Sequence, residues 1–237
     1  MGASIVAPIS HCGAPGATEL IDTARRQGEI AQRIDPAKGR PMTLSKALVP
    51  SQSLLARAIM VLGGSLFIAL AAQVSIGFPV PMTLQTLAIL IVGFSFGART
   101  GALTLMAYLA EGALGLPVFA EGKNFLAFAG PTAGFLAGFV GMAYLAGLAA
   151  DRGVRGFVPT ALVAIGVSLL LYIPGIAWAM LADRAFGFDA SRWGADTLAM
   201  VWQYYMAPFL IGDAVKAVMA ALVVSGGWVA LKNYRKG

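Results

Sequence analysis

LLARAIMVLGGSLFIALAAQVSI, residues 54–76, is an apolar stretch with one charged side chain, Arg57, close to its start. A helix needs roughly 17–25 mostly apolar residues to cross the hydrocarbon core of a bilayer. The stretch therefore predicts a membrane-spanning helix.

Five further apolar segments follow it, and each is long enough to be considered a span. The second of the six is the shortest, and Gly77, Pro79 and Pro81 interrupt regular helix at its start, so we expect it to be tilted, irregular or partly re-entrant. The six segments run over about Leu54–Ile76, Pro81–Gly97, Gly101–Phe119, Pro131–Ala150, Phe157–Ala182 and Ala199–Leu231. The predicted fold is all-α, an integral membrane bundle of six transmembrane helices.

The composition supports a membrane domain and leaves no room for a soluble one beside it. Apolar residues make up 58% of the chain, charged residues 12%, and the mean hydropathy is +0.77. Soluble domains carry about 25% charged residues. Residues 1–50 are rich in Gly, Pro, Ala and charge, and their start lacks the pattern of a cleaved signal peptide. We expect a disordered cytoplasmic tail over residues 1–50 and the substrate-binding membrane domain over residues 51–237.

Basic residues give the bundle a direction, because cytoplasmic loops carry an excess of Lys and Arg. With a cytoplasmic N-terminal tail, 13 basic residues fall on the inner side and three on the outer side. Leaving out the tail residues before Lys46 still gives eight against three. The inner set is Arg25, Arg26, Arg33, Lys38, Arg40, Lys46, Arg57, Arg99, Arg152, Arg155, Lys232, Arg235 and Lys236, and the outer set is Lys123, Arg184 and Arg192. The sequence predicts that both termini are inside (N-in, C-in).

This orientation puts the longer connections outside. They are Gln73–Pro81, Leu116–Gly130 and Asp183–Asp196, whereas the inward gaps at Ala98–Thr100 and Asp151–Gly156 are short. Longer loops more often carry function, so we expect a site near the outer face.

Ionisable groups are rare within the apolar segments. Asp213 and Lys216 lie three residues apart, on one face of the sixth segment, and should face the bundle interior because a charge facing lipid is costly. They are either a structural ion pair or a polar ligand site, in which Asp accepts N–H bonds and Lys donates to an oxygen. Glu111 is either a second buried acid or a group that reaches the outer interface.

Two other features of the segments have a functional and a structural interpretation. Ser65 and Ala69 form a small-xxx-small pair that serves either packing within the bundle or a partner helix. Aromatic residues such as Tyr172 and Trp178 either belong to an interfacial belt or line an apolar pocket for a ring-containing ligand.

Several kinds of chemistry are not expected. The chain has no phosphate-binding loop, no zinc-protease motif and no serine-nucleophile elbow. Its one histidine, His11, lies beside its one cysteine, Cys12, without further metal ligands nearby. The basic residues follow the membrane pattern, so nucleic-acid binding is not expected. We predict a protein that is not an enzyme, needs no cofactor or metal of its own, and takes its energy from elsewhere.

Four blocks of the sequence resemble the BioY family, the biotin-specific substrate-binding (S) components of energy-coupling factor (ECF) transporters. They are QVSIGFPVPMTLQT (residues 73–86), LAEGALGLPVFAEG (109–122), GPTAGFLAGF (130–139) and PFLIGDAVKA (208–217). They occur in the family's order, and the resemblance extends from about Leu54 to Val224. The tail and the last residues lie outside it.

The resemblance implies six membrane helices in a prokaryotic cell membrane and biotin bound near the extracellular side. It implies as partners a transmembrane coupling subunit and ABC-type ATPases, which use the ATP. Asp213 and Lys216 match the family's G-D-x-x-K pattern, whose residues contact biotin. The loop AEGKNFLAFAGPT (120–132) is more charged and less glycine-rich than usual in the family; it carries Asn124 and Thr132, to which we extend the predicted ligand contacts.

The resemblance also implies a surface for the coupling subunit on the first helix, where Ser65 and Ala69 are the nearest candidates. Two other interpretations of the chain remain: a membrane enzyme that uses Asp213, Lys216 and Glu111, and a structural membrane protein whose charged pair only sets helix packing. The enzyme requires a nucleophile or metal ligands that the sequence does not offer. Biotin binding by the purified chain distinguishes the three.

Overall fold

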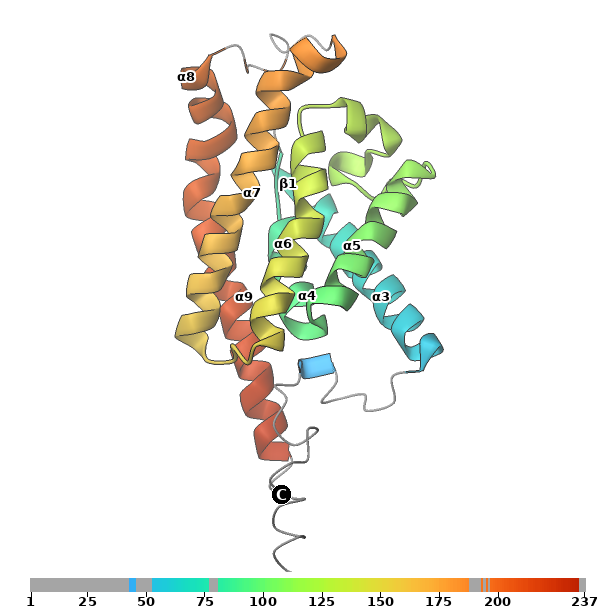
Figure 1. Ribbon diagram of the computed structural model, residues 1–237, viewed down its shortest axis with the longest axis vertical. Coiled ribbons are helices and arrows are strands. Elements are labelled where there is room, and N and C mark those ends of the chain that lie inside the picture. The colour runs from blue at the N-terminus through green and yellow to red at the C-terminus, as the bar shows by residue number, and fades with distance from the viewer. Residues whose placement is uncertain are drawn as a thin grey trace, which may run out of the picture. The chain divides into compact units, whose positions relative to one another are not determined.

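The computed structural model describes residues 43–45, 53–76, 81–187, 193, 195 and 197–234. The tail expected over residues 1–50 lies outside the described residues except for 43–45, and so does half of the expected outer loop Asp183–Asp196. In the described part, long helices run alongside one another and short elements connect them (Figure 1). The elements are α3 (Leu54–Gln73), β1 (Ser75–Ile76), β2 (Met82–Thr83), α4 (Gln85–Phe96), α5 (Ala98–Ala113), the 3-10 helices η1 (Ala120–Gly122) and η2 (Phe125–Ala129), α6 (Ala133–Asp151), α7 (Phe157–Phe186), α8 (Leu198–Val201), the π-helix η4 (Trp202–Met206) and α9 (Ala207–Tyr234).

Within the described part of the chain, four helical stretches are long and apolar enough to cross a membrane, namely Leu54–Gln73, Ala133–Asp151, Phe157–Ala182 and Leu198–Tyr234. They confirm four of the six expected spans. The other two expected segments correspond to α4, with 12 residues, and α5, with 16. At about 1.5 Å per residue, neither reaches across a hydrocarbon core of about 30 Å.

The irregular start expected for the second segment contains a short β pairing. Ser75 pairs with Thr83 and Ile76 with Met82 in an antiparallel arrangement. The backbone N–H of Leu84 donates to the carbonyl of Val74 at 3.3 Å, which extends this pairing by one bond. The mostly helical class is confirmed, with this two-stranded element as an addition that the apolar pattern did not predict.

The expected inner gap Ala98–Thr100 is instead the first turn of α5. Gly97 alone separates α4 from α5, and its φ of 84° lies in the left-handed region that glycine adopts without strain. Asp151, at the end of α6, accepts a hydrogen bond from the N–H of Ala98 at 2.9 Å and so caps α5. In place of the expected gap, α5 begins directly after Gly97 and is capped by a residue of α6. The sequence around residues 98–100 does not predict this cap, because Asp151 is distant along the chain.

Helix α6 packs against α4, α5 and α7, while α9 packs against α4 and α7 (Figure 1). Small residues allow these helices to approach closely: a Cβ on Gly93 of α4 would lie 2.8 Å from the carbonyl oxygen of Ala143 in α6. By contrast, α3 exposes a row of large apolar side chains, Leu55, Ile59, Leu62, Leu66 and Leu70. Such a surface is suited to lipid or to another membrane helix.

Candidate functional site

A cavity opens among α4, α6, α7, α9 and the segment that carries η1 and η2. Its empty space, including open solvent at the mouth, is about 720 Å³. The lining residues are Pro81, Thr83, Gln85, Thr86, Phe119, Ala120, Lys123, Ala127, Thr132, Phe135, Leu136, Phe139, Leu171, Tyr172, Tyr205, Phe209, Asp213 and Lys216. Mostly apolar walls with a few polar groups are typical of sites that bind a small organic molecule.

Asp213 and Lys216 form the polar centre of this cavity. Both side chains are almost completely buried, and Lys216 Nζ lies 3.0 Å from Asp213 Oδ1. The Tyr172 hydroxyl donates to Asp213 Oδ2 at 2.7 Å. The Thr86 hydroxyl bridges the pair, since it donates to Asp213 Oδ1 at 3.5 Å and accepts from Lys216 Nζ at 3.2 Å. Four side chains from α4, α7 and α9 therefore satisfy two buried charges.

This cluster keeps hydrogen-bonding capacity for a ligand. A carboxylate accepts about four hydrogen bonds and an ammonium donates three. Among the described residues, Asp213 accepts from Lys216, Thr86 and Tyr172, and Lys216 donates to Asp213 and Thr86. By this count Asp213 keeps one acceptor position and Lys216 one donor, and both residues line the cavity.

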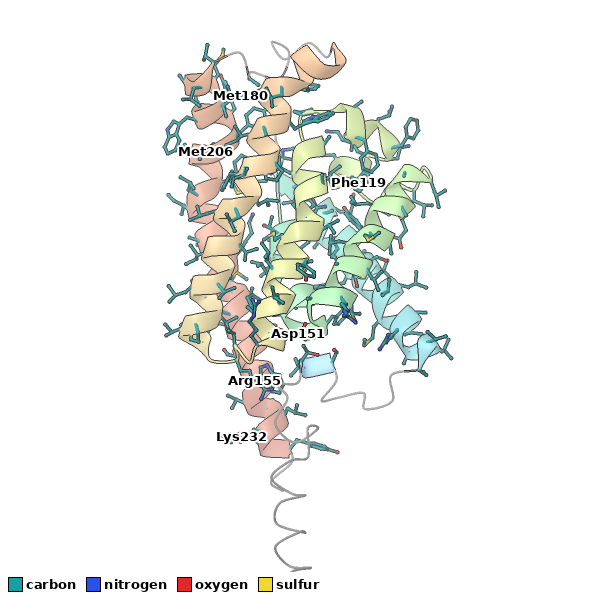
Figure 2. The ribbon with its side chains drawn as sticks, in the orientation of Figure 1. Phe119, Asp151, Arg155, Met180, Met206 and Lys232 are labelled. Carbon is teal, nitrogen blue, oxygen red and sulfur yellow. The ribbon has the colours of Figure 1, made fainter. Side chains whose placement is uncertain are left out.

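A second series of hydrogen bonds holds residues of the cavity wall in place. Gln85 Nε2 donates to the Tyr108 hydroxyl at 2.7 Å, and that hydroxyl donates to the Val118 carbonyl at 3.0 Å. The Tyr108 ring packs edge-to-face on Phe119, whose ring packs in the same way on Phe128. This network fixes Phe119 in the wall, toward the end of the bundle opposite Arg155 and Lys232 (Figure 2).

The structure brings together four of the predicted site residues, Asp213, Lys216, Tyr172 and Thr132, all of which line the cavity. The other three are not among its described lining residues and have structural partners. Asn124 caps η2 by accepting from the N–H of Leu126 at 3.3 Å. Trp178 donates from Nε1 to the Gly130 carbonyl at 2.9 Å, and Glu111 accepts from the Ser65 hydroxyl at 2.7 Å. Their ligand contacts stay predictions.

Ser65 and Ala69 lie on the inner face of α3. Ser65 is 1% exposed and bonded to Glu111 of α5, and Ala69 is 8% exposed. Small residues at this position bring α3 close to α5, as the packing interpretation required. The part of α3 accessible to a partner is the opposite, leucine-rich face; a partner contact through Ser65 and Ala69 themselves stays a prediction.

Sequence reasoning did not single out Gln85, Thr86 or Lys123 as site residues. All three lie within or next to the family blocks, at the ends of apolar runs, where polar residues are common for structural reasons. Their proximity to Asp213 or to the cavity depends on contacts between helices far apart in sequence, so no local pattern identified them.

Comparisons with known proteins show which family the chain resembles. The sequence profile of the BioY family matches residues 42–233. The "Biotin transporter BioY" of Rhodobacter capsulatus is 40% identical over 161 residues, which cover 63% of this chain and 80% of that protein. The protein of the same description from Rhizobium etli is 37% identical over 164 residues, covering 65% and 81%. The "Probable biotin transporter BioY" of Pyrococcus horikoshii is 35% identical and covers 67% and 90%.

The fold is similar to a solved one, the S-component for biotin from an ECF-type ABC transporter. The TM-score is 0.53 at 20% identity, and the match covers 79% of this chain and 96% of the other. The four long apolar helices and the family match make this chain a multi-pass membrane protein. Because the family profile covers most of its length, the chain belongs to the BioY family.

Proposed function

We propose that this protein captures biotin from the outer side of the membrane as the substrate-binding subunit of an ECF-type transporter. The observation that carries the proposal is the cavity with the buried Asp213–Lys216 pair, in a chain whose relatives are described as biotin transporters. Family membership also argues for transport rather than catalysis.

The chemistry of biotin matches the cavity wall. Its ureido ring offers two N–H donors and one carbonyl acceptor. One N–H suits the remaining acceptor position of Asp213, and the carbonyl suits the remaining donor of Lys216. The second N–H needs another polar side chain of the lining, such as Gln85 or Thr86. Each buried polar group left unmatched would cost about 1–3 kcal/mol. The apolar thiophane ring suits the aromatic and aliphatic side chains of Phe135, Phe139 and Leu171.

The energy for uptake comes from partners in this proposal. The sequence contains no phosphate-binding loop, and the solved structure of similar fold is a component of an ABC transporter. We therefore assign to this chain an ECF transmembrane coupling subunit and ABC-type ATPases as partners. The exposed leucine-rich face of α3 is available for a membrane-embedded partner.

The proposed topology has six membrane segments with both termini inside. The charge count of the loops supports it, as does the position of Arg155 and Lys232 at the end of the bundle opposite Phe119 (Figure 2). In this arrangement α4 with the β pairing before it, and α5 with the residues after it, make the two remaining passages. Residues 1–50 are then a cytoplasmic tail and residues 51–237 the membrane domain.

Cysteine labelling tests the topology, because Cys12 is the only cysteine. We expect a membrane-impermeant maleimide to label Cys12 only after permeabilisation. Glu121→Cys in a Cys12→Ala background should react in intact cells, since Glu121 is exposed near the cavity mouth. Labelling of Cys12 in intact cells would contradict the proposed orientation.

Binding of labelled biotin to the purified, detergent-solubilised chain tests the function. We expect saturable binding that unlabelled biotin competes away. Binding of a different vitamin in place of biotin would keep the transport class and reject the substrate. Binding of neither would reject the assignment of the cavity.

A further inference from the structure

A third charged side chain lines the cavity, at a different depth from the buried pair. Lys123 follows η1, and its side chain is 50% exposed, whereas the side chains of Asp213 and Lys216 are 11% and 9% exposed. Since Lys123 both lines the cavity and faces solvent, it lies where the cavity opens. The ligand therefore meets one cation at the mouth and an ion pair at the closed end.

The backbone around Lys123 is held in a fixed turn. The N–H of Phe119 donates to the Lys123 carbonyl at 3.0 Å, and the N–H of Gly122 donates to Gln73 Oε1 at 3.1 Å. Gln73 Nε2 also donates to the Phe119 carbonyl at 3.2 Å, so one side chain of α3 clamps both ends of the turn. Glu121 adopts a left-handed φ of 60°, unusual for a non-glycine residue, within this clamp. The turn thus keeps the Lys123 side chain near the mouth.

Lys123 has an ion-pair partner that is easily replaced. Its Nζ lies 2.7 Å from Glu121 Oε2, and the Glu121 side chain is 44% exposed. Exposed ion pairs contribute little to stability, typically about 0–1 kcal/mol. An incoming carboxylate can therefore displace Glu121 from Lys123 at small cost.

A ligand with one negative charge can complete the charge balance of the cavity. Asp213 and Lys216 neutralise each other, and Lys123 at the mouth is neutralised by Glu121, which is not among the described lining residues, until a ligand carboxylate replaces it. Biotin carries one negative charge at neutral pH, on the carboxylate at the end of its chain, far from the ureido ring. If the ureido group of the ligand contacts Asp213 at the closed end of the cavity, the carboxylate at the other end of the ligand lies toward the mouth.

We infer that Lys123 binds the carboxylate of the ligand and selects for its charge, while Glu121 takes the place of that carboxylate in the empty cavity. This inference rests on the proposed biotin binding. In this inference the two lysines bind different groups of the ligand: Lys216 binds the ureido carbonyl and Lys123 binds the carboxylate.

The test combines two ligands with three variants. Biotin and its uncharged methyl ester are titrated into the wild type, Lys123→Gln and Glu121→Gln, with Lys232→Gln as a control that removes a lysine charge at the opposite end of the bundle (Figure 2). For a half-exposed charge-assisted contact, we expect the wild type to prefer biotin about five- to tenfold. Lys123→Gln should lose this preference by weakening biotin alone, Glu121→Gln should bind biotin more tightly, and Lys232→Gln should match the wild type.

The outcomes separate the inference from the function on which it rests. If the wild type does not bind biotin, the proposed function fails. If the wild type binds biotin and Lys123→Gln retains the full preference over the ester, the function stands and the role of Lys123 is refuted. Equal weakening of both ligands in Lys123→Gln also refutes it, because that result indicates damage to the turn rather than loss of a charge contact.

Discussion

Asp213→Asn is expected to weaken biotin binding at least tenfold, which corresponds to about 1.4 kcal/mol. The substitution keeps the size of the side chain but removes its charge, and it replaces one acceptor oxygen with a donor. Lys216 then remains as a buried cation without a counter-charge, and the Tyr172 hydroxyl loses its carboxylate partner. Equilibrium binding of labelled biotin to the purified variant measures the effect.

A second variant separates recognition from the cost of an unpaired charge. Asp213→Asn combined with Lys216→Met removes both charges, so it should recover thermal stability relative to Asp213→Asn. It should not recover biotin affinity, because neither the acceptor nor the donor for the ureido group returns. Wild-type affinity in either variant would show that the pair serves only helix packing.

Gly134→Ala is expected to lower the melting temperature by about 5–10 °C, because overpacking costs typically 1–3 kcal/mol. A Cβ on Gly134 of α6 would overlap the backbone carbonyl of Pro174 and the Cβ of Trp178 in α7. Backbone atoms cannot rotate away, so the two helices must separate. Biotin affinity should fall as well, because Tyr172 on α7 would move relative to Asp213.

Gly141→Ala is the matched control for this prediction. Gly141 lies on the same helix, but a Cβ there meets no atom within 4 Å. Alanine has the higher helix propensity, so this variant should be as stable as the wild type or slightly more stable. Thermal unfolding in detergent, followed by circular dichroism, compares the two. Equal melting temperatures for both variants would refute the close approach of α6 and α7 at Gly134.

The predicted boundaries were accurate where one segment makes one helix. The first, fourth and fifth segments correspond to α3, α6 and α7, because a long apolar run satisfies its own backbone as a helix in any apolar environment. They were less accurate around Gly97, where α4 and α5 meet. There a single residue in the left-handed region reverses the chain, and Asp151 supplies the cap from another helix.

The polar pair was predictable in part. The three-residue spacing of Asp213 and Lys216 places both on one helix face, and the cost of a charge in lipid predicts that the face turns inward. The partners of the pair were not predictable in this way. Tyr172 and Thr86 lie 41 and 127 residues from Asp213 along the chain, and only helix packing brings them together.

The sequence by itself therefore determined the membrane class, the position of the long helices and the buried charged pair, because hydropathy and charge act on each segment independently. Tertiary structure decided which helices enclose the cavity, that Ser65 faces α5, and that Lys123 stands at the mouth. These features depend on close contacts among α3, α4, α6, α7 and α9, which form between residues distant in sequence. A local pattern specifies that a side chain must be buried, whereas its partner is specified only by the packed bundle.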